Sequence, residues 1–238
     1  MTAPTPLRIV SWNVRSLRDD RSAVVQVLRE LRPDIVALQE APRFLRSRTR
    51  LAALAREADL VFCCGGRAAA GTALLTSLRV DVLRSHEALL PPSPRLHRRG
   101  CALAEVRVSG DAGPGLVVAA VHLGLDAEER RRHARYIREL VAAFRCGPGV
   151  VAGDFNEGPT GAAWGILAAG HDDPGAQAGQ PTFPANDPQH RIDAVLVPAG
   201  VPAVSTVRGD GLVAAATDHC PVVVEVLPQG PAGDPAAD

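Results

Sequence analysis

The chain has 238 residues, a length that suits one large domain and can bury a substantial core. Hydrophobic residues make up 46% and charged residues 22% of it, which is ordinary for a globular protein. The 26 basic and 26 acidic residues give a formal net charge of zero, which argues against strong nonspecific binding to DNA but leaves room for a local basic groove. Every basic side chain other than histidine is arginine, and we attribute this to codon bias rather than to phosphate binding.

The cysteines and the N-terminus indicate the compartment. The five cysteines are odd in number and form no C-x-x-C spacing, which argues against both a disulfide framework and a zinc site. The N-terminus lacks a basic region followed by an apolar segment, and no apolar run approaches the roughly 20 residues that span a bilayer. We therefore expect a soluble, cytoplasmic monomer with one domain over residues 1–228 and a disordered tail at 229–238.

Apolar runs and helical periodicities follow one another along the chain. The pattern of the first half predicts strands at 7–12, 35–38, 60–63 and 72–75 and helices at 22–31 and 43–57. We expect the helix at 43–57 to bury Phe44, Leu51, Leu54 and Ala55. The second half predicts a strand pair at 101–108 and 115–122, a helix from Asp126 stopped by Gly147-Pro148, a strand at 150–151, a short helix at 160–169 and strands at 192–197 and 222–226. This order is neither strictly alternating nor all-β, so it predicts two packed sheets flanked by helices.

Polar side chains stand at the boundaries of these apolar strands. The residues concerned are Asn13, Glu40, His122, Asp154, Asn156, Asp193, Asp218 and His219. Taken singly, each has an ordinary interpretation as a turn residue or a solvated group. Together they predict a site at the ends of the sheets, because loops on a rigid scaffold commonly carry chemistry.

These segments resemble, in order, the motifs of the endonuclease/exonuclease/phosphatase superfamily, the fold of deoxyribonuclease I and exonuclease III. The matching pieces are Ser11-Trp-Asn13, Leu38-Gln-Glu40, Val121-His-Leu123, Gly153-Asp-Phe-Asn156, Arg191-Ile-Asp193 and Thr217-Asp-His219. The resemblance covers nearly the whole chain and implies a four-layered α/β/β/α sandwich with the site at one edge of two packed sheets. It also implies hydrolysis of a phosphoester with Mg²⁺ or Mn²⁺, ions that prefer oxygen ligands.

The resemblance implies a metal site and a water-activating group. Glu40 would be the main metal carboxylate and Asn13 would assist it, while Asp218 would bind the metal or tune its neighbours. Asp154 would orient or deprotonate the attacking water, and Asn156 would position the nucleophile and the phosphate. Since side chains alternate along an extended strand, we expect Asp154 and Asn156 to point to the same side and reach one water.

Two histidines complete the implied machinery. His219 would donate to a phosphate oxygen, with Asp193 fixing its tautomer and orientation. His122 stands where exonuclease III and the abasic endonucleases have tyrosine, and where deoxyribonuclease I, sphingomyelinases and many phosphatases have histidine. It would contact the phosphate or protonate the leaving group.

The chain also departs from its relatives. Arg15 replaces an acidic residue of the abasic endonucleases, and Ala194 replaces an aromatic residue or histidine of many relatives. The segment Pro181-Thr-Phe-Pro184 resembles small bacterial members known only as metal-dependent hydrolases, some of them suspected of acting on phospholipids or other small phosphodiesters.

Several functions remain open at this point. The leading one is a phosphodiesterase with nuclease-type chemistry, and the first alternative is a phosphatase or phosphodiesterase of small molecules or lipid headgroups. Arginine-rich segments at 43–50, 95–99 and 130–132 would line a nucleic-acid groove or form solvated faces, and for 130–132 we favour a solvated face. The zero net charge and an aromatic content of 3%, which leaves few rings to stack on bases, favour a small substrate slightly. A catalytically inactive binding module is the second alternative, and the intact motif positions argue against it.

Overall fold

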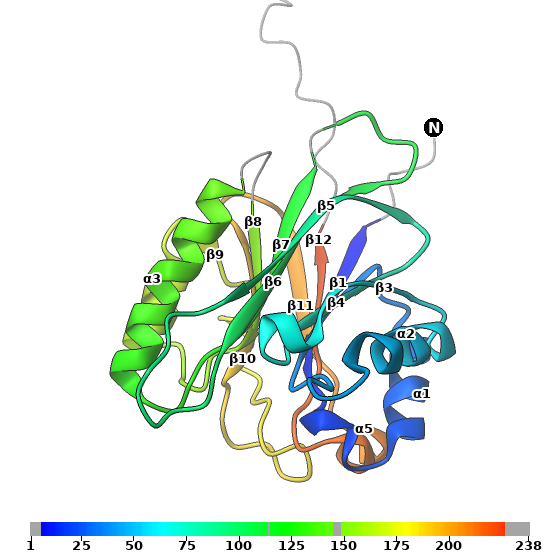
Figure 1. Cartoon of the computed structure of the whole chain (residues 1–238), viewed down its shortest axis with the longest axis horizontal. Helices are drawn as coiled ribbons and strands as arrows, with labels where there is room; N and C mark the ends of the chain where they lie inside the picture. Colours follow the sequence, from blue (N-terminus) through cyan, green and yellow to red (C-terminus); the bar gives the residue numbers. More distant parts are fainter. Residues whose placement is uncertain (1–5, 114, 145–148, 227–238) are drawn as a thin grey trace, which may run out of the picture.

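The computed structural model describes residues 6–113, 115–144 and 149–226, which form two six-stranded sheets (Figure 1). The first sheet has the order β11 (Ala203–Val207), β12 (Val222–Val226), β1 (Leu7–Asn13), β2 (Ile35–Gln39), β4 (Ala73–Thr76), β3 (Val61–Gly65). The second has the order β5 (Val80–Leu89), β6 (Gly100–Val108), β7 (Leu116–His122), β8 (Gly149–Asp154), β10 (Asp193–Pro198), β9 (His171–Asp172). Each sheet contains one parallel pair, β1 with β2 and β7 with β8, among antiparallel neighbours.

Helices cover the outer face of each sheet (Figure 1). The first sheet packs against α1 (Arg21–Leu31), α2 (Ser47–Glu57) and α5 (Gly211–Ala216), and the second against α3 (Ala127–Ala143) and α4 (Ala162–Ala168). Two 3₁₀ turns, η1 (Arg15–Leu17) and η2 (Gly66–Ala69), complete the elements of the described ranges. Three buried apolar layers result, one under each set of helices and one between the sheets. The predicted four-layered α/β/β/α sandwich is confirmed.

Strand β1 shows why so many strands read as continuous apolar runs. Ile9 lies in the core between the sheets, whereas Val10 and Trp12 lie in the core under α1 and α2. A strand buried on both faces cannot alternate apolar and polar residues. The charged and amide side chains predicted to form the site therefore lie at or just beyond the strand ends, as Asn13 and Glu40 do.

The helix predicted over 43–57 begins later than expected. Arg46 adopts a left-handed conformation, with φ of 58°, and α2 starts at Ser47. Leu51, Leu54 and Ala55 are buried as expected, but the prediction that Phe44 is buried is wrong because Phe44 precedes the helix and lies in an exposed loop.

The strands that the sequence did not indicate are peripheral. Strands β5, β9 and β11 lie at sheet edges, and β5 exposes most of its residues. An edge strand has one partner and needs no apolar run, so its sequence carries a weak signal. The predicted stop at Gly147-Pro148 and the predicted tail at 229–238 lie outside the described residues. No helix in the described ranges is long and apolar enough to cross a bilayer.

Candidate active site

Three neighbouring strands of the second sheet present functional side chains at the same edge. His122 pairs with Asp154 in the parallel register of β7 and β8, and Asp193 pairs with Asp154 in the antiparallel register of β8 and β10. Gly153 permits this spacing, because a Cβ atom there would lie 2.2 Å from the carbonyl oxygen of Val121. The glycine of the Gly-Asp-Phe-Asn motif therefore allows β7 to approach closely.

The first sheet contributes Asn13 and Glu40 to the same edge. Asn13 ends β1 and Glu40 follows β2, in adjacent parallel strands. The Nδ2 group of Asn13 donates to Oδ2 of Asp154 at 3.0 Å and lies 3.4 Å from Oε1 of Glu40. One buried amide thus joins two carboxylates from different sheets.

His219 and Asp193 form a buried pair. Nδ1 of His219 lies 3.0 Å from Oδ2 of Asp193, and Nε2 lies 3.9 Å from Oδ2 of Asp154. Burial alone would lower the pKa of His219, but the charge of Asp193 outweighs it and raises this pKa to about 9. His219 is therefore a cation at neutral pH, with Nε2 directed toward Asp154.

Two residues that sequence reasoning did not assign to the site support this pair. Thr182 donates its hydroxyl to Oδ2 of Asp193 at 2.6 Å, and the ring of Phe183 lies 4.8 Å from that of His219, between centroids. Both belong to the Pro181–Pro184 segment, whose resemblance to small bacterial hydrolases was the one available signal.

The Asp154 carboxylate is buried beside a second carboxylate, that of Asp193, so its ionised form is disfavoured. Burial, with the nearby charge of Asp193, raises its pKa to about 7. A carboxylate in this range exchanges a proton readily near neutral pH, as a general base should.

His122 is in the opposite state to His219. Its Nε2 lies 3.4 Å from Oδ2 of Asp154, and both of its ring nitrogens lie 3.0 Å from Nη1 of Arg99. Burial, together with the adjacent Arg99 guanidinium, holds the pKa of His122 well below its usual value. His122 is therefore neutral, and the positive charge at this end of the site belongs to Arg99.

Arg99 was included in an arginine-rich segment but was not predicted as a site residue. It lies directly before β6, the strand that pairs with β7. Its Nε is buried and has no hydrogen-bond partner in the part of the chain that the structure describes, so this N–H is available to donate to a ligand. One arginine among 26 basic residues gives no signal of its own in the sequence.

Asn156 corrects one expectation. Strand β8 ends at Asp154, and Asn156 has a left-handed φ of 52°, so the prediction that both lie along one extended strand is wrong. The Asn156 N–H donates to Oδ1 of Asp154 at 2.9 Å, and Nδ2 donates to the Leu123 carbonyl at 2.8 Å. The turn places Asn156 against the loop that follows His122.

Asp218 forms an ion pair outside the central cluster. Its Oδ2 lies 3.3 Å from Nε of Arg15, the residue that replaces an acid of the abasic endonucleases. Its charge still contributes to the raised pKa of His219. Of the two roles predicted for Asp218, this geometry favours tuning.

The donor set suits a divalent cation. Donor atoms of Asp154, Asp193 and His219 lie within 4.8 Å of one another, and Glu40 lies across Asn13 from Asp154. Because Asp193 and His219 are bound to each other, Glu40 and Asp154 are the freer carboxylates. Oxygen donors of this kind fit Mg²⁺ or Mn²⁺.

Solved structures share this architecture. An endonuclease/exonuclease/phosphatase from Bacteroides vulgatus superposes with a TM-score of 0.77 at 20% identity, over 94% of this chain and 99% of that one. The Bacteroides thetaiotaomicron mannosyl-6-phosphatase Bt3783 gives a TM-score of 0.77 at 19% identity, over 92% and 99%. D. rerio TDP2 complexed with single strand DNA product gives 0.68 at 20% identity, over 94% and 99%. These similarities define the fold class.

The sequence itself identifies the family. A model of the Endonuclease/Exonuclease/phosphatase family matches residues 10–219, and the chain belongs to that family. No curated protein matches the chain.

Proposed function

We propose that the protein is a divalent-metal-dependent phosphoesterase that acts on phosphodiesters. The observation that carries this proposal is the convergence of Asn13, Glu40, Asp154, Asp193 and His219 at one edge of both sheets. Glu40 would hold the cation with the help of Asn13, and the cation, when bound, would neutralise phosphate charge.

Asp154 and His219 would act on the water and the phosphate. Asp154, with a pKa of about 7, accepts the proton of the attacking water. His219 donates from Nε2 to a non-bridging phosphate oxygen as negative charge grows there. Asp193 and Thr182 hold the ring in the orientation that this requires.

His122 and Arg99 would hold the phosphate from the other side. Neutral His122 is a poor proton donor to a leaving group, so its lowered pKa favours the phosphate-contact role. The Arg99 guanidinium supplies a charge that pH does not remove and a fork of donors suited to phosphate oxygens. Asn156 fixes the loop after His122 through the Leu123 carbonyl.

A phosphomonoesterase is the second candidate. Two cationic groups, Arg99 and His219, flank the position of the phosphate, and a terminal phosphate carries one negative charge more than a diester. The similarity in fold to a mannosyl-6-phosphatase agrees with this alternative.

Replacement of His219 tests the proposal. We expect His219→Ala to reduce kcat for bis-p-nitrophenyl phosphate with Mn²⁺ by about 10²-fold or more, because a positioned donor to the phosphate is lost. His86→Ala is the matched control, since His86 is exposed on the edge strand β5. Comparing p-nitrophenyl phosphate with the diester decides between the two candidates. Equal rates for both variants and the wild type would remove His219 from the mechanism.

A further inference from the structure

A basic hollow opens beside the proposed phosphate position. It has a volume of about 510 Å³ and is lined by Arg43, Phe44, Leu45, Arg67, His97 and Arg98, together with the apolar side chains of Ala70 and Leu89. We name the first six of these residues the basic hollow. They come from the loop after Glu40, from η2 and from the loop before Arg99.

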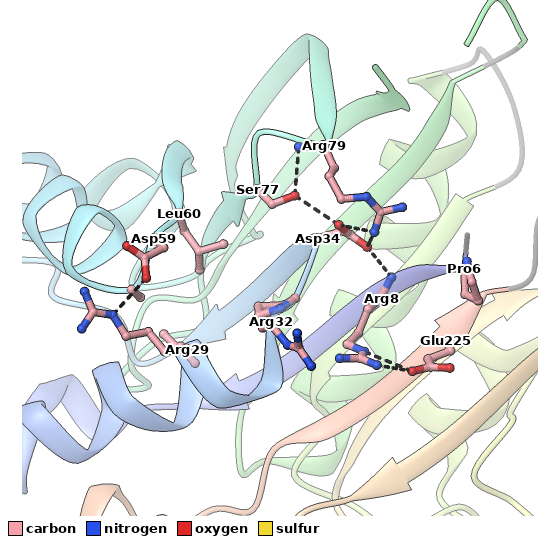
Figure 2. Close-up of a pocket in the computed structure, with 13 residues that line it drawn as sticks. Pro6, Arg8, Arg29, Arg32, Asp34, Asp59, Leu60, Ser77, Arg79 and Glu225 are labelled. Atoms are coloured by element: carbon pink, nitrogen blue, oxygen red, sulfur yellow. Dashed lines mark hydrogen bonds and ion pairs between the residues drawn. The ribbon is translucent and has the colours of Figure 1, made fainter. Parts of the chain in front are cut away.

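The hollow carries uncompensated positive charge. No carboxylate lines it, and none of its arginines forms an ion pair with a described residue. A second hollow at the opposite end of β1 and β2 behaves differently (Figure 2). There the side chains of Arg8, Arg29 and Arg79 pair with Glu225, Asp59 and Asp34. Arginine lining is thus common to both hollows. Three of the four arginines of the far hollow pair with carboxylates, whereas none of the three arginines of the basic hollow pairs with a described carboxylate.

The basic hollow also exposes apolar side chains. Phe44 is 72% exposed and Leu45 is 83% exposed, at the start of a loop where neither contributes to a core. The Arg43 guanidinium lies 5.5 Å from the Phe44 ring centroid, which leaves a ring and a cation side by side at the surface. Exposed apolar groups beside unpaired cations commonly mark a binding surface.

The basic hollow adjoins the candidate active site, because Ala69 of η2 packs against Gly100, the residue after Arg99. Arg43 follows Glu40 by three residues, and its charge reaches His122 and Arg99. Arg98 immediately precedes Arg99, whose guanidinium contacts His122. A substrate with its phosphate between His122 and His219 would therefore be able to reach the hollow.

We propose that the basic hollow binds the nucleotide next to the scissile phosphate, and that the substrate is a short single-stranded oligonucleotide. This inference rests on the proposed function. Arg67 and Arg98 would hold the next phosphate, and a base would stack on Phe44, as in proteins that bind single strands through cationic grooves and aromatic platforms. A substrate with a single phosphate group would have no second phosphate for Arg67 and Arg98 to bind. The hollow is also concave, which fits an extended strand better than it fits a flat lipid bilayer.

Steady-state rates on two diesters test this proposal. The measured quantity is the kcat/KM for an octathymidylate with Mn²⁺, divided by the kcat/KM for bis-p-nitrophenyl phosphate. We expect Arg67→Ala/Arg98→Ala to lower this ratio about tenfold, and Phe44→Ala to lower it about fivefold or more. Arg29→Ala/Arg32→Ala removes the same number of charges from the far hollow and should leave the ratio unchanged.

Binding without turnover provides the second measurement. Anisotropy of labelled octathymidylate in EDTA should show weaker binding by Arg67→Ala/Arg98→Ala than by Arg29→Ala/Arg32→Ala. Equal affinities and equal rate ratios would overturn the inference. So would loss of binding to phosphatidylglycerol vesicles in the first variant with no change in the rate ratio, because the hollow would then serve a lipid surface. If the wild type hydrolyses neither octathymidylate nor bis-p-nitrophenyl phosphate, the proposed function itself is wrong. If it hydrolyses bis-p-nitrophenyl phosphate but not octathymidylate, only this inference is wrong.

Discussion

The two arginine-lined hollows differ in what the arginines contact. In the far hollow, of about 650 Å³, Arg79 and Arg8 lie 2.9 Å and 2.5 Å from carboxylates (Figure 2). Arg8 also donates to the Leu31 carbonyl at the end of α1. These arginines neutralise carboxylates, and Arg8 also satisfies a backbone carbonyl at the C-terminus of a helix, so their role is structural. In the basic hollow beside the candidate active site the guanidiniums have no such partners among the described residues. The comparison teaches that pairing, rather than the number of arginines, separates the proposed binding surface from the structural one.

The largest effect should come from the centre that adjoins the basic hollow. We expect Asp154→Asn to reduce kcat/KM for bis-p-nitrophenyl phosphate by about 10³-fold, because the proposed general base is lost. Since burial raises the pKa of Asp154, its ionised form opposes folding above that pKa, and the variant should unfold at a higher temperature at pH 8 in EDTA. A fall in both quantities would indicate that Asp154 is a structural residue.

The next largest effect should come from breaking the Asp34–Arg79 ion pair in the far hollow. The Asp34 carboxylate is buried and accepts hydrogen bonds from Arg8 N, Ser77 and Arg79. We expect Asp34→Asn to destabilise the protein by about 2–3 kcal/mol in urea unfolding, because charge-assisted bonds are lost. Its kcat per folded molecule should not change. A catalytic defect at full occupancy of the native state would contradict the division between the two hollows.

A smaller effect separates the hollows by their response to salt. For single strands each phosphate contact contributes about 0.7 to the slope of log affinity against log salt. Arg67→Ala/Arg98→Ala should therefore flatten the slope for octathymidylate by about 1.4. Arg29→Ala/Arg32→Ala should retain the wild-type slope, and an equal flattening in both variants would mean that the charge acts nonspecifically.

The smallest effect concerns pH. The pKa of His219 is raised to about 9, so its protonation stabilises the metal-free native state. That contribution is fully present below the unfolded pKa of about 6.5 and is lost as the pH rises toward 9. In EDTA, the stability advantage of the wild type over His219→Gln should shrink across this window in urea unfolding. A constant difference would show that His219 is not a cation at neutral pH.

The sequence predicted the layers, and it placed the candidate site residues at strand ends, for one physical reason. Strands such as β1 are buried on both faces, so a polar residue at the strand end, such as Asn13, stands out against its neighbours. The motif order then indicated that residues as distant as Glu40 and His219 serve one site.

Other features left no comparable signal. Nothing in the sequence distinguishes Arg99 from the other arginines, because its role depends on a contact with His122 that only the structure shows. The turn at Asn156 depends on a left-handed backbone conformation that asparagine adopts only in some contexts. The partnership of Asp218 with Arg15 joins segments about 200 residues apart, and nothing local in either segment requires it.

The central claim is that the convergent carboxylates bind a cation on which hydrolysis depends. Its most direct test is the initial rate of bis-p-nitrophenyl phosphate hydrolysis by EDTA-stripped protein as Mn²⁺ is added, for the wild type and for Glu40→Gln. We predict no turnover without metal, saturable recovery in the wild type, and recovery in Glu40→Gln only at a much higher Mn²⁺ concentration. Full turnover in EDTA, or identical Mn²⁺ curves for the two proteins, would contradict the claim.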